Sequence, residues 1–188
     1  MARYAKEHKR ETRERIITSA GRRLKSDGID GSGVAALMAD AGLTNGAFYA
    51  HFGSKEELVA IAVAAELRSQ QESLGEYAAA GGLEGVVRAY LSAEHRDDPA
   101  GGCASAALLD EIGRCAAETR RIYTDGVLDV IDGMAVLLDP ADPAAARVKA
   151  LSLYALLAGT LQLARAVADR ALSEEILEQG IDNALALI

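Results

Sequence analysis

The stretch LTNGAFYAHFGSKEEL, residues 43–58, carries the strongest structural signal in this chain. Thr44 predicts the start of a short helix, because its side-chain oxygen can accept hydrogen bonds from backbone N–H groups two or three residues further on. Phe48 and Phe52 lie four residues apart, so their side chains share one helix face and point into a small core. A short helix with small and polar residues on its other faces is how a helix-turn-helix meets a DNA groove.

Helices are also predicted on both sides of this stretch. The first is expected over residues 9–26, where apolar residues recur every four positions at Ile16, Ala20 and Leu24. A second, short helix starts at Ser32 or Gly33, and its core-facing residues are Val34, Leu37, Met38 and Ala41. After the stretch, Ser54 followed by Glu57 forms a capping box, which opens a helix over residues 54–74.

The remainder of the chain also reads as helical, because no alternating strand pattern competes and the breaks fall at Gly and Pro clusters. Five more helices are expected, over residues 82–95, 104–115, 117–138, 143–168 and 173–187, the last opened by Ser173. The prediction is an all-α protein of about nine helices. Residues 1–53 form a helix-turn-helix domain and residues 54–188 a helical body, with helix 54–74 connecting the two.

Charge is distributed unevenly along the chain. The net charge is −8, but residues 1–25 carry nine Lys or Arg against three Glu, whereas residues 61–188 carry ten basic against twenty acidic residues. A basic end can meet a polyanion while an acidic body stays away from it, although a basic end can also be only a solvated face.

Several classes of protein and site are disfavoured. The two cysteines give no disulfide framework, the N-terminus has no apolar signal core, and the longest uncharged apolar run, residues 150–164, is shorter than the roughly 20 residues of a membrane span. We therefore expect a cytoplasmic protein. Catalytic and nucleotide-binding motifs are absent from the sequence and its three histidines are scattered, so we expect no enzyme, no metal site and no cofactor.

The stretch and the segments around it resemble the TetR family of bacterial transcriptional regulators. The resemblance runs from Thr12 to about Val63 and includes Gly28, the run Ala41-Gly42-Leu43-Thr44, and the capping box. It implies a repressor that binds a palindromic operator as a homodimer and is released by a small-molecule effector. Three positions depart from the family pattern. Gly33 replaces a Thr or Ser, which weakens one cap or phosphate contact. Asn45 and Ala47 replace a common Ser or Lys and a common Thr or Ser, so the operator sequence is expected to differ.

The helix-turn-helix assigns roles to ten residues. Asn45 is expected to read an adenine edge, Ala47 to touch a thymine methyl group, and Gly46 to let the backbone approach closely. Phosphate contacts are expected from residues around this helix and from the first helix, namely Arg10, Arg13, Ser32, Thr44, Tyr49, His51 and Lys55.

The body is expected to hold the dimer interface and the effector pocket. Helix 143–168 is apolar on more than one face, which predicts that one face packs in the body and another against a partner. With the last helix it supplies the expected interface: Leu153, Leu156, Leu157, Leu161, Ile176, Leu177, Ile181 and Leu185. The pocket implied by the resemblance has as candidate lining residues Tyr90, Leu91, His95, Cys103, Leu108, Asp110, Glu111, Tyr123, Val127, Met134 and Tyr154.

Two alternative functions stay open. Cys103 and Cys115 suggest a regulator that responds to oxidation, but twelve residues of helix would separate them by roughly 15 Å or more, too far for an internal disulfide. The other alternative, of a different class, is a helical module that binds a protein partner through its N-terminal domain.

Overall fold

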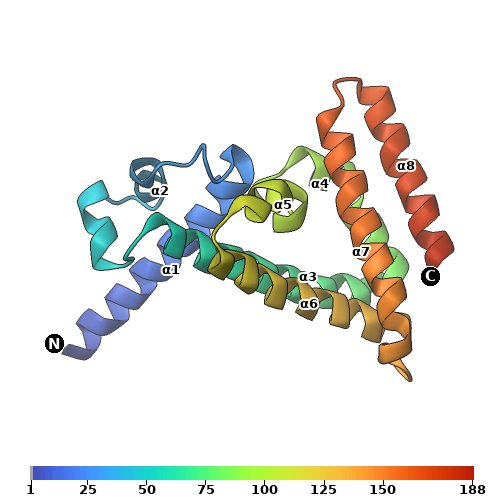
Figure 1. The fold of residues 1–188 in the computed structure, drawn as a ribbon, viewed down its shortest axis with the longest axis horizontal. Coiled ribbons are helices and arrows are strands. Elements are labelled where there is room, and N and C mark those ends of the chain that lie inside the picture. The colour runs from blue at the N-terminus through green and yellow to red at the C-terminus, as the bar shows by residue number, and fades with distance from the viewer. Residues whose placement is uncertain (1) are drawn as a thin grey trace.

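The computed structural model describes residues 2–188, with side chains from Lys6 onward, and this part of the chain contains helices and no strands (Figure 1). The all-α prediction is confirmed. The elements are α1 (Ala2–Asp27), α2 (Val34–Asp40), the 3-10 helix η1 (Asn45–Ala50), α3 (Lys55–Tyr90), α4 (Ala93–Asp97), α5 (Ala104–Arg114), α6 (Ala117–Leu138), α7 (Pro143–Ala166) and α8 (Arg170–Leu187).

Helix α3 is two helices joined by a kink. Gly81 and Gly82 have non-helical dihedral angles inside it, and Gly82 has a φ of 62°. Only glycine adopts this left-handed conformation without steric penalty, which explains why the predicted break at residues 80–82 is found there. The first part therefore extends beyond the predicted end at residue 74.

Two helices differ from prediction for local reasons. The segment that starts with Asn45 is a 3-10 helix rather than an α-helix, and Thr44 occupies the N-cap position without a side-chain cap hydrogen bond. Helix α8 begins at Arg170 rather than Ser173, because Asp169 accepts hydrogen bonds from the next backbone N–H groups. Ser173 is instead buried, and its hydroxyl donates to the carbonyl of Ala164 at 2.6 Å.

Two apolar cores hold the molecule together. The N-terminal core is built by α1, α2, η1 and the start of α3, and includes Ile16, Ala20, Leu24, Leu37, Met38, Ala41, Phe48 and Phe52, all predicted to be buried. The body core is built by α3 from Leu74 onward with α6, α7 and α8. In Figure 1, α3 and α6 run side by side, α1 and α2 lie at one end of them, and α7 and α8 stand at the other.

Helix α5 contributes to both cores. Cys103 at its N-cap and Ala106 belong to the body core, whereas Leu108 and Ile112, one and two turns further on, belong to the N-terminal core. The predicted division after residue 53 therefore does not coincide with the division between the two cores.

Candidate DNA-binding surface, pocket and dimer face

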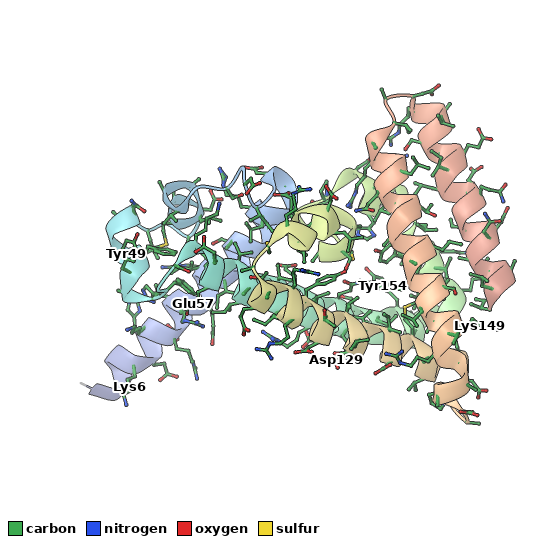
Figure 2. The ribbon with its side chains drawn as sticks, viewed as in Figure 1. Lys6, Tyr49, Glu57, Asp129, Lys149 and Tyr154 are labelled. Atoms are coloured by element: carbon green, nitrogen blue, oxygen red, sulfur yellow. The ribbon has the colours of Figure 1, made fainter. Side chains whose placement is uncertain are left out.

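The segment around η1 presents a polar surface over a fully apolar base. Phe48 and Phe52 are 1% and 2% exposed, so they anchor the segment on the N-terminal core. Asn45 and Gly46 are exposed, and Tyr49 is 77% exposed and projects from the end of the molecule that carries α1 (Figure 2). The Tyr49 ring lies edge-on to the buried Phe48 ring, with 5.2 Å between the centroids, and its exposed hydroxyl is open to a partner.

Gly46 has no structural reason to be glycine. Its φ is not in the left-handed region, and a Cβ atom built on it would meet only Thr44 Oγ1, at 4.0 Å. The Thr44 side chain is exposed and makes no cap hydrogen bond, so its hydroxyl is available to a ligand. These facts fit a surface that another molecule approaches closely.

Basic side chains of α1 flank this surface. The Arg13 guanidinium lies over the Phe52 ring, 4.9 Å from its centroid, and 4.0 Å from Glu57. Arg10 is exposed and forms only solvent-exposed pairs, with Glu7 at 3.4 Å and Glu14 at 3.6 Å. Such pairs are weak and exchange readily for a phosphate.

His51 ends the segment and is half-buried. Burial, followed by the nearby Lys9 and Arg13 charges, lowers the pKa of His51 below its ordinary value. The ring is therefore neutral near pH 7. Its Nδ1 atom is buried and has no hydrogen-bond partner among the described residues.

Two of the residues expected at DNA are engaged inside the protein. Ser32 is fully buried and its hydroxyl donates to the Gly28 carbonyl at 2.6 Å, so the prediction that it contacts phosphate is wrong for this structure. Lys55 Nζ donates to the Ile29 carbonyl at 2.6 Å. Its predicted phosphate contact would require this bond to be exchanged or shared.

A pocket with a volume of about 320 Å³ lies in the body, between α3, α4, the N-terminal end of α5, α6 and α7. Five of the predicted lining residues are found in its wall: Tyr90, His95, Cys103, Met134 and Tyr154. Its wall also contains residues that no sequence pattern predicted, among them Glu66, Gln70 and Asp98. The size suits a small organic ligand.

The other predicted pocket residues do not line this cavity, and each has another position. Leu91 and Leu108 are buried core residues, Tyr123 packs against the N-terminal core, Val127 packs against the body core, and Asp110 is exposed. Glu111 accepts hydrogen bonds from the backbone N–H groups of Ile29 and Asp30, at 2.8 and 3.0 Å. It therefore ties α5 to the turn between α1 and α2.

A chain of hydrogen bonds runs along the inner wall of the pocket. The Tyr154 hydroxyl lies 2.7 Å from Ser105 Oγ, which lies 2.8 Å from the Tyr123 hydroxyl, and the Cys103 thiol donates to Gln70 Oε1 at 3.1 Å. Burial raises the pKa of Tyr154 well above its ordinary value, so this hydroxyl stays protonated. The wall is thus neutral and well ordered at this side.

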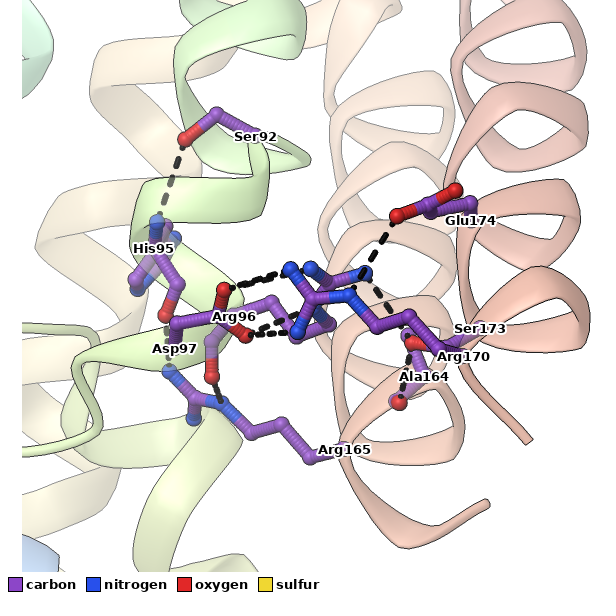
Figure 3. Close-up of polar contacts among 9 residues, drawn as sticks. All are labelled: Ser92, His95, Arg96, Asp97, Ala164, Arg165, Arg170, Ser173 and Glu174. Atoms are coloured by element: carbon purple, nitrogen blue, oxygen red, sulfur yellow. Dashed lines mark hydrogen bonds and ion pairs between the residues drawn. The ribbon is translucent and has the colours of Figure 1, made fainter. Parts of the chain in front are cut away.

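Helix α4 closes the pocket and is clamped to α7 and α8 by arginines (Figure 3). Arg165 donates to the carbonyls of His95 and Arg96, at 2.5 and 3.1 Å. Arg96 is itself buried and pairs with Asp97, which also accepts two hydrogen bonds from Arg170. These hydrogen bonds with Arg96 and Arg170 hold the pKa of the Asp97 carboxyl well below its usual range.

His95 joins this clamp to the pocket wall. Its Nδ1 lies 2.7 Å from the Tyr90 carbonyl, and its Nε2 accepts from the Cys103 N–H at 2.9 Å. Only the neutral ring protonated at Nδ1 satisfies both contacts. Burial, as the largest cause, lowers the pKa of His95 and favours this neutral form.

The predicted dimer residues divide into two groups, neither of which is freely exposed. Leu153, Leu157, Leu161 and Leu177 are at most 4% exposed within the single chain, so their assignment to an interface is wrong: they form the body core. Leu156, Ile176, Ile181 and Leu185 are half-buried against the same core.

A second apolar face of α7 is nevertheless present, as the pattern predicted. Its exposed members recur at helical spacing and are Val148, Leu151, Ala155, Gly159 and Leu163, with Val148 73% and Leu163 54% exposed. We call these five residues the α7 stripe. These residues add to the apolar character of α7, which by length and composition alone could cross a membrane. Of its most apolar window, 39% is buried inside the protein.

The fold and the exposed η1 surface define a helix-turn-helix DNA-binding protein with a separate helical body. Residues 16–66 match the sequence model of the bacterial regulatory proteins of the tetR family. The N-terminal part of the chain therefore carries the domain by which the tetR family is recognised, and this family is one of transcriptional regulators rather than enzymes.

Solved structures support the same fold over nearly the whole chain. A TetR-family regulator from Cytophaga hutchinsonii is 21% identical, with a TM-score of 0.77 over 95% of this chain and 96% of that one. The reduced form of NemR from E. coli is 21% identical, with a TM-score of 0.75 over 93% and 95%. A TetR-family regulator from Streptomyces coelicolor is 21% identical, with a TM-score of 0.67 over 94% and 95%. No curated protein sequence matches the chain.

Proposed function

We propose that this protein is a cytoplasmic, homodimeric repressor that binds a palindromic operator and is released from it by a small molecule in the pocket. The observation that carries the proposal is the exposed surface at Thr44, Asn45, Gly46 and Tyr49, which rests on two buried phenylalanines. Exposed donors and acceptors on a rigid base suit contact with base edges and phosphates.

Each residue of this surface has a distinct proposed role. Asn45 reads an adenine edge and Ala47 a thymine methyl group, whereas Thr44 and Tyr49 donate to phosphates. Arg10, Arg13 and His51 reach the neighbouring backbone from the side. Lys55 remains a candidate phosphate ligand despite its bond to the Ile29 carbonyl.

Selection of DNA from a random pool, followed by salt-titrated binding, tests this proposal. We expect Tyr49→Phe to weaken binding to all selected sequences alike, whereas Asn45→Ala changes the preferred base at one position of each half-site. Thr124→Val is the control, because Thr124 also carries a hydroxyl on an exposed residue but lies on α6 of the body. Failure of the wild-type protein to enrich any sequence would refute the operator reading and favour a protein partner.

Lys55→Ala tests the remaining phosphate contact. If Lys55 neutralises a phosphate in the complex, the slope of log affinity against log salt should fall by about 1. An unchanged slope would mean that Lys55 only holds the turn at Ile29.

A dimer is proposed because one small helix-turn-helix domain offers little contact area for specific binding. The α7 stripe supplies an apolar surface for a second copy. We expect Leu163→Asp to shift the protein to a monomer in light scattering and to weaken operator binding. Val136→Asp is the control, since Val136 is similarly exposed but lies on α6. A dimer unaffected by Leu163→Asp would exclude this face.

Oxidation is a second candidate input, because Cys103 is found in the wall of the pocket. An internal disulfide with Cys115 is not proposed: the intact α5 helix separates the two by roughly 18 Å. Peroxide titration of operator binding, with Cys103→Ser as the comparison, distinguishes the inputs. Equal peroxide sensitivity of both proteins would remove Cys103 from consideration.

A further inference from the structure

The pocket wall carries an excess of negative charge. Among its described lining residues are three carboxylates, Glu66, Glu94 and Asp98, and no Lys or Arg. Glu94 and Asp98 form no ion pair with the described residues. Asp98 uses one oxygen to accept from the Gly101 N–H at 3.0 Å, and its charge acts on nearby Arg165 without a direct ion pair.

The two nearest cations are already engaged behind the wall. Lys25, on α1, is 6% exposed, and its Nζ donates to Glu66 Oε2 at 2.5 Å and to the Gly102 carbonyl at 2.8 Å. Arg165 donates from Nε and Nη2 to two carbonyls at the end of α4, while its Nη1 is buried and has no hydrogen-bond partner among the described residues. The N-terminal end of α5 also borders the pocket and favours negative charge, but a helix end is equivalent to only about half a unit charge.

The wall also offers aromatic surface and a free hydroxyl. Tyr90 and Tyr154 line the pocket with Tyr77, and tyrosine faces attract cations. The Tyr90 hydroxyl is buried and has no hydrogen-bond partner among the described residues. An unsatisfied buried hydroxyl is unfavourable, so it favours a ligand that brings a polar group to it.

We propose that the effector is an aromatic organic cation whose charged group competes with Lys25 for Glu66. This rests on the proposed function, since it names the ligand of the same pocket. Glu66 can bind either Lys25 or the ligand cation. It lines the pocket, and its side chain remains 18% exposed while it pairs with Lys25.

The same competition connects the pocket to the DNA-binding end. Lys25 belongs to the last turn of α1, and its ammonium is the charged contact between that helix and the pocket wall. A buried ammonium that loses its carboxylate partner is strongly disfavoured and must move toward water. Since α1 packs on α2 and α2 packs on η1 within the N-terminal core, displacement of α1 changes where the two η1 surfaces of a dimer lie.

The α1–α3 crossing is close at this ion pair. Gly21 lies against the Glu66 side chain, and a Cβ atom at this position would overlap the carboxylate. Glu66 is therefore confined between α1 and the pocket. Exchange of Lys25 for a ligand as the partner of Glu66 therefore changes a direct contact of α1.

Three fluorescent probes with one scaffold test the charge preference: 4-(1-naphthyl)butylammonium, 4-(1-naphthyl)butan-1-ol and 4-(1-naphthyl)butyrate. We expect the ammonium to bind the free protein about tenfold more tightly than the alcohol, as a charged hydrogen bond replaces a neutral one, and the carboxylate to bind most weakly. Glu66→Gln should reduce the preference for the ammonium to less than about threefold while the alcohol binds as before.

Lys25→Met is expected to raise the affinity for the ammonium probe, which Glu66→Gln is expected to lower. Removal of the competing ammonium should make the probe ammonium bind more tightly than to wild type, whereas Lys149→Met, at an exposed lysine of α7, should change nothing. If Lys25→Met does not fold, Glu66→Gln carries the test alone. Equal affinity for the three probes, or an ammonium preference that survives Glu66→Gln, would overturn the proposal.

Operator binding separates this inference from the proposed function. A protein that binds its selected operator but shows no cation preference refutes only the ligand class. A protein that shows the preference but binds no operator supports the ligand class and refutes the repressor reading.

Discussion

Replacement of Glu111 with Ala deletes the carboxylate that accepts hydrogen bonds from the backbone N–H groups of Ile29 and Asp30. Glu111 lies on α5, whereas the two N–H groups belong to the turn between α1 and α2. The Ile29 contact is partly buried and the Asp30 contact is exposed. The substitution therefore leaves one donor poorly hydrated and lets water reach the other.

The expected loss follows from these two contacts. A hydrogen bond to a charged group contributes about 1.5–3 kcal/mol, and water replaces most of the exposed one, so we expect a total loss of about 2 kcal/mol. For a protein of this size the midpoint of thermal unfolding should fall by about 4–8 °C. Circular dichroism melts at pH 7 measure this, and operator affinity should fall as well because the turn precedes α2.

Asp110→Ala is the matched control for this prediction. Asp110 is the preceding residue of α5, its side chain is 90% exposed, and it forms a 2.7 Å surface pair with Arg114. Such pairs contribute about 0–1 kcal/mol, so its effect should be a small fraction of that of Glu111→Ala. Similar losses for the two variants would show that Glu111 does not hold the turn and would refute the reasoning.

Three further outcomes are expected in denaturation experiments. Gly180→Ala should lose about 1–3 kcal/mol by overpacking α8 against α7, whereas Gly113→Ala, with open space around it, should gain about 0.5–1 kcal/mol; a loss in both would contradict this. Gly82→Ala should lose about 1–2 kcal/mol because its φ is left-handed, and unchanged stability would mean that the kink relaxes. His95 has a lowered pKa through burial, so its stabilising contribution is present above pH 6.5 and is lost as the pH falls below it; the stability difference between wild type and His95→Gln should shrink between pH 7.5 and 5.5, and a constant difference would refute this.

Local patterns predicted the N-terminal part well. Phe48 and Phe52 are buried as their spacing indicated. Ser54 accepts from the Glu57 N–H as in a capping box, whereas the Glu57 carboxylate accepts from the Gly53 N–H, one residue before the N-cap. Helix α6 spans residues 117–138 as expected. These features depend on residues within one or two turns of each other, so the sequence alone contains the information.

Long-range contacts could not be predicted in this way. Lys25 looks like one more charge of a basic segment, but it is buried against Gly102, 77 residues away. Leu153 and Leu163 both fit an apolar helix with two faces, and only packing decides that Leu153 enters the core and Leu163 stays exposed. One sequence feature is consistent with the burial of Lys25. It lies one position after the core residue Leu24 and four after Gly21, where α1 and α3 cross closely.

The division of α5 between the two cores has a consequence for protein engineering. Hybrid regulators are made by joining the DNA-binding domain of one protein to the helical body of another. A junction after residue 66 would follow the end of the family match. With this junction the DNA-binding domain would lose Leu108 and Ile112, which lie on α5, after the junction, but belong to the N-terminal core. A transferred DNA-binding domain must therefore include the second half of α5. Otherwise its core must be redesigned to fill the cavities that the two missing side chains leave.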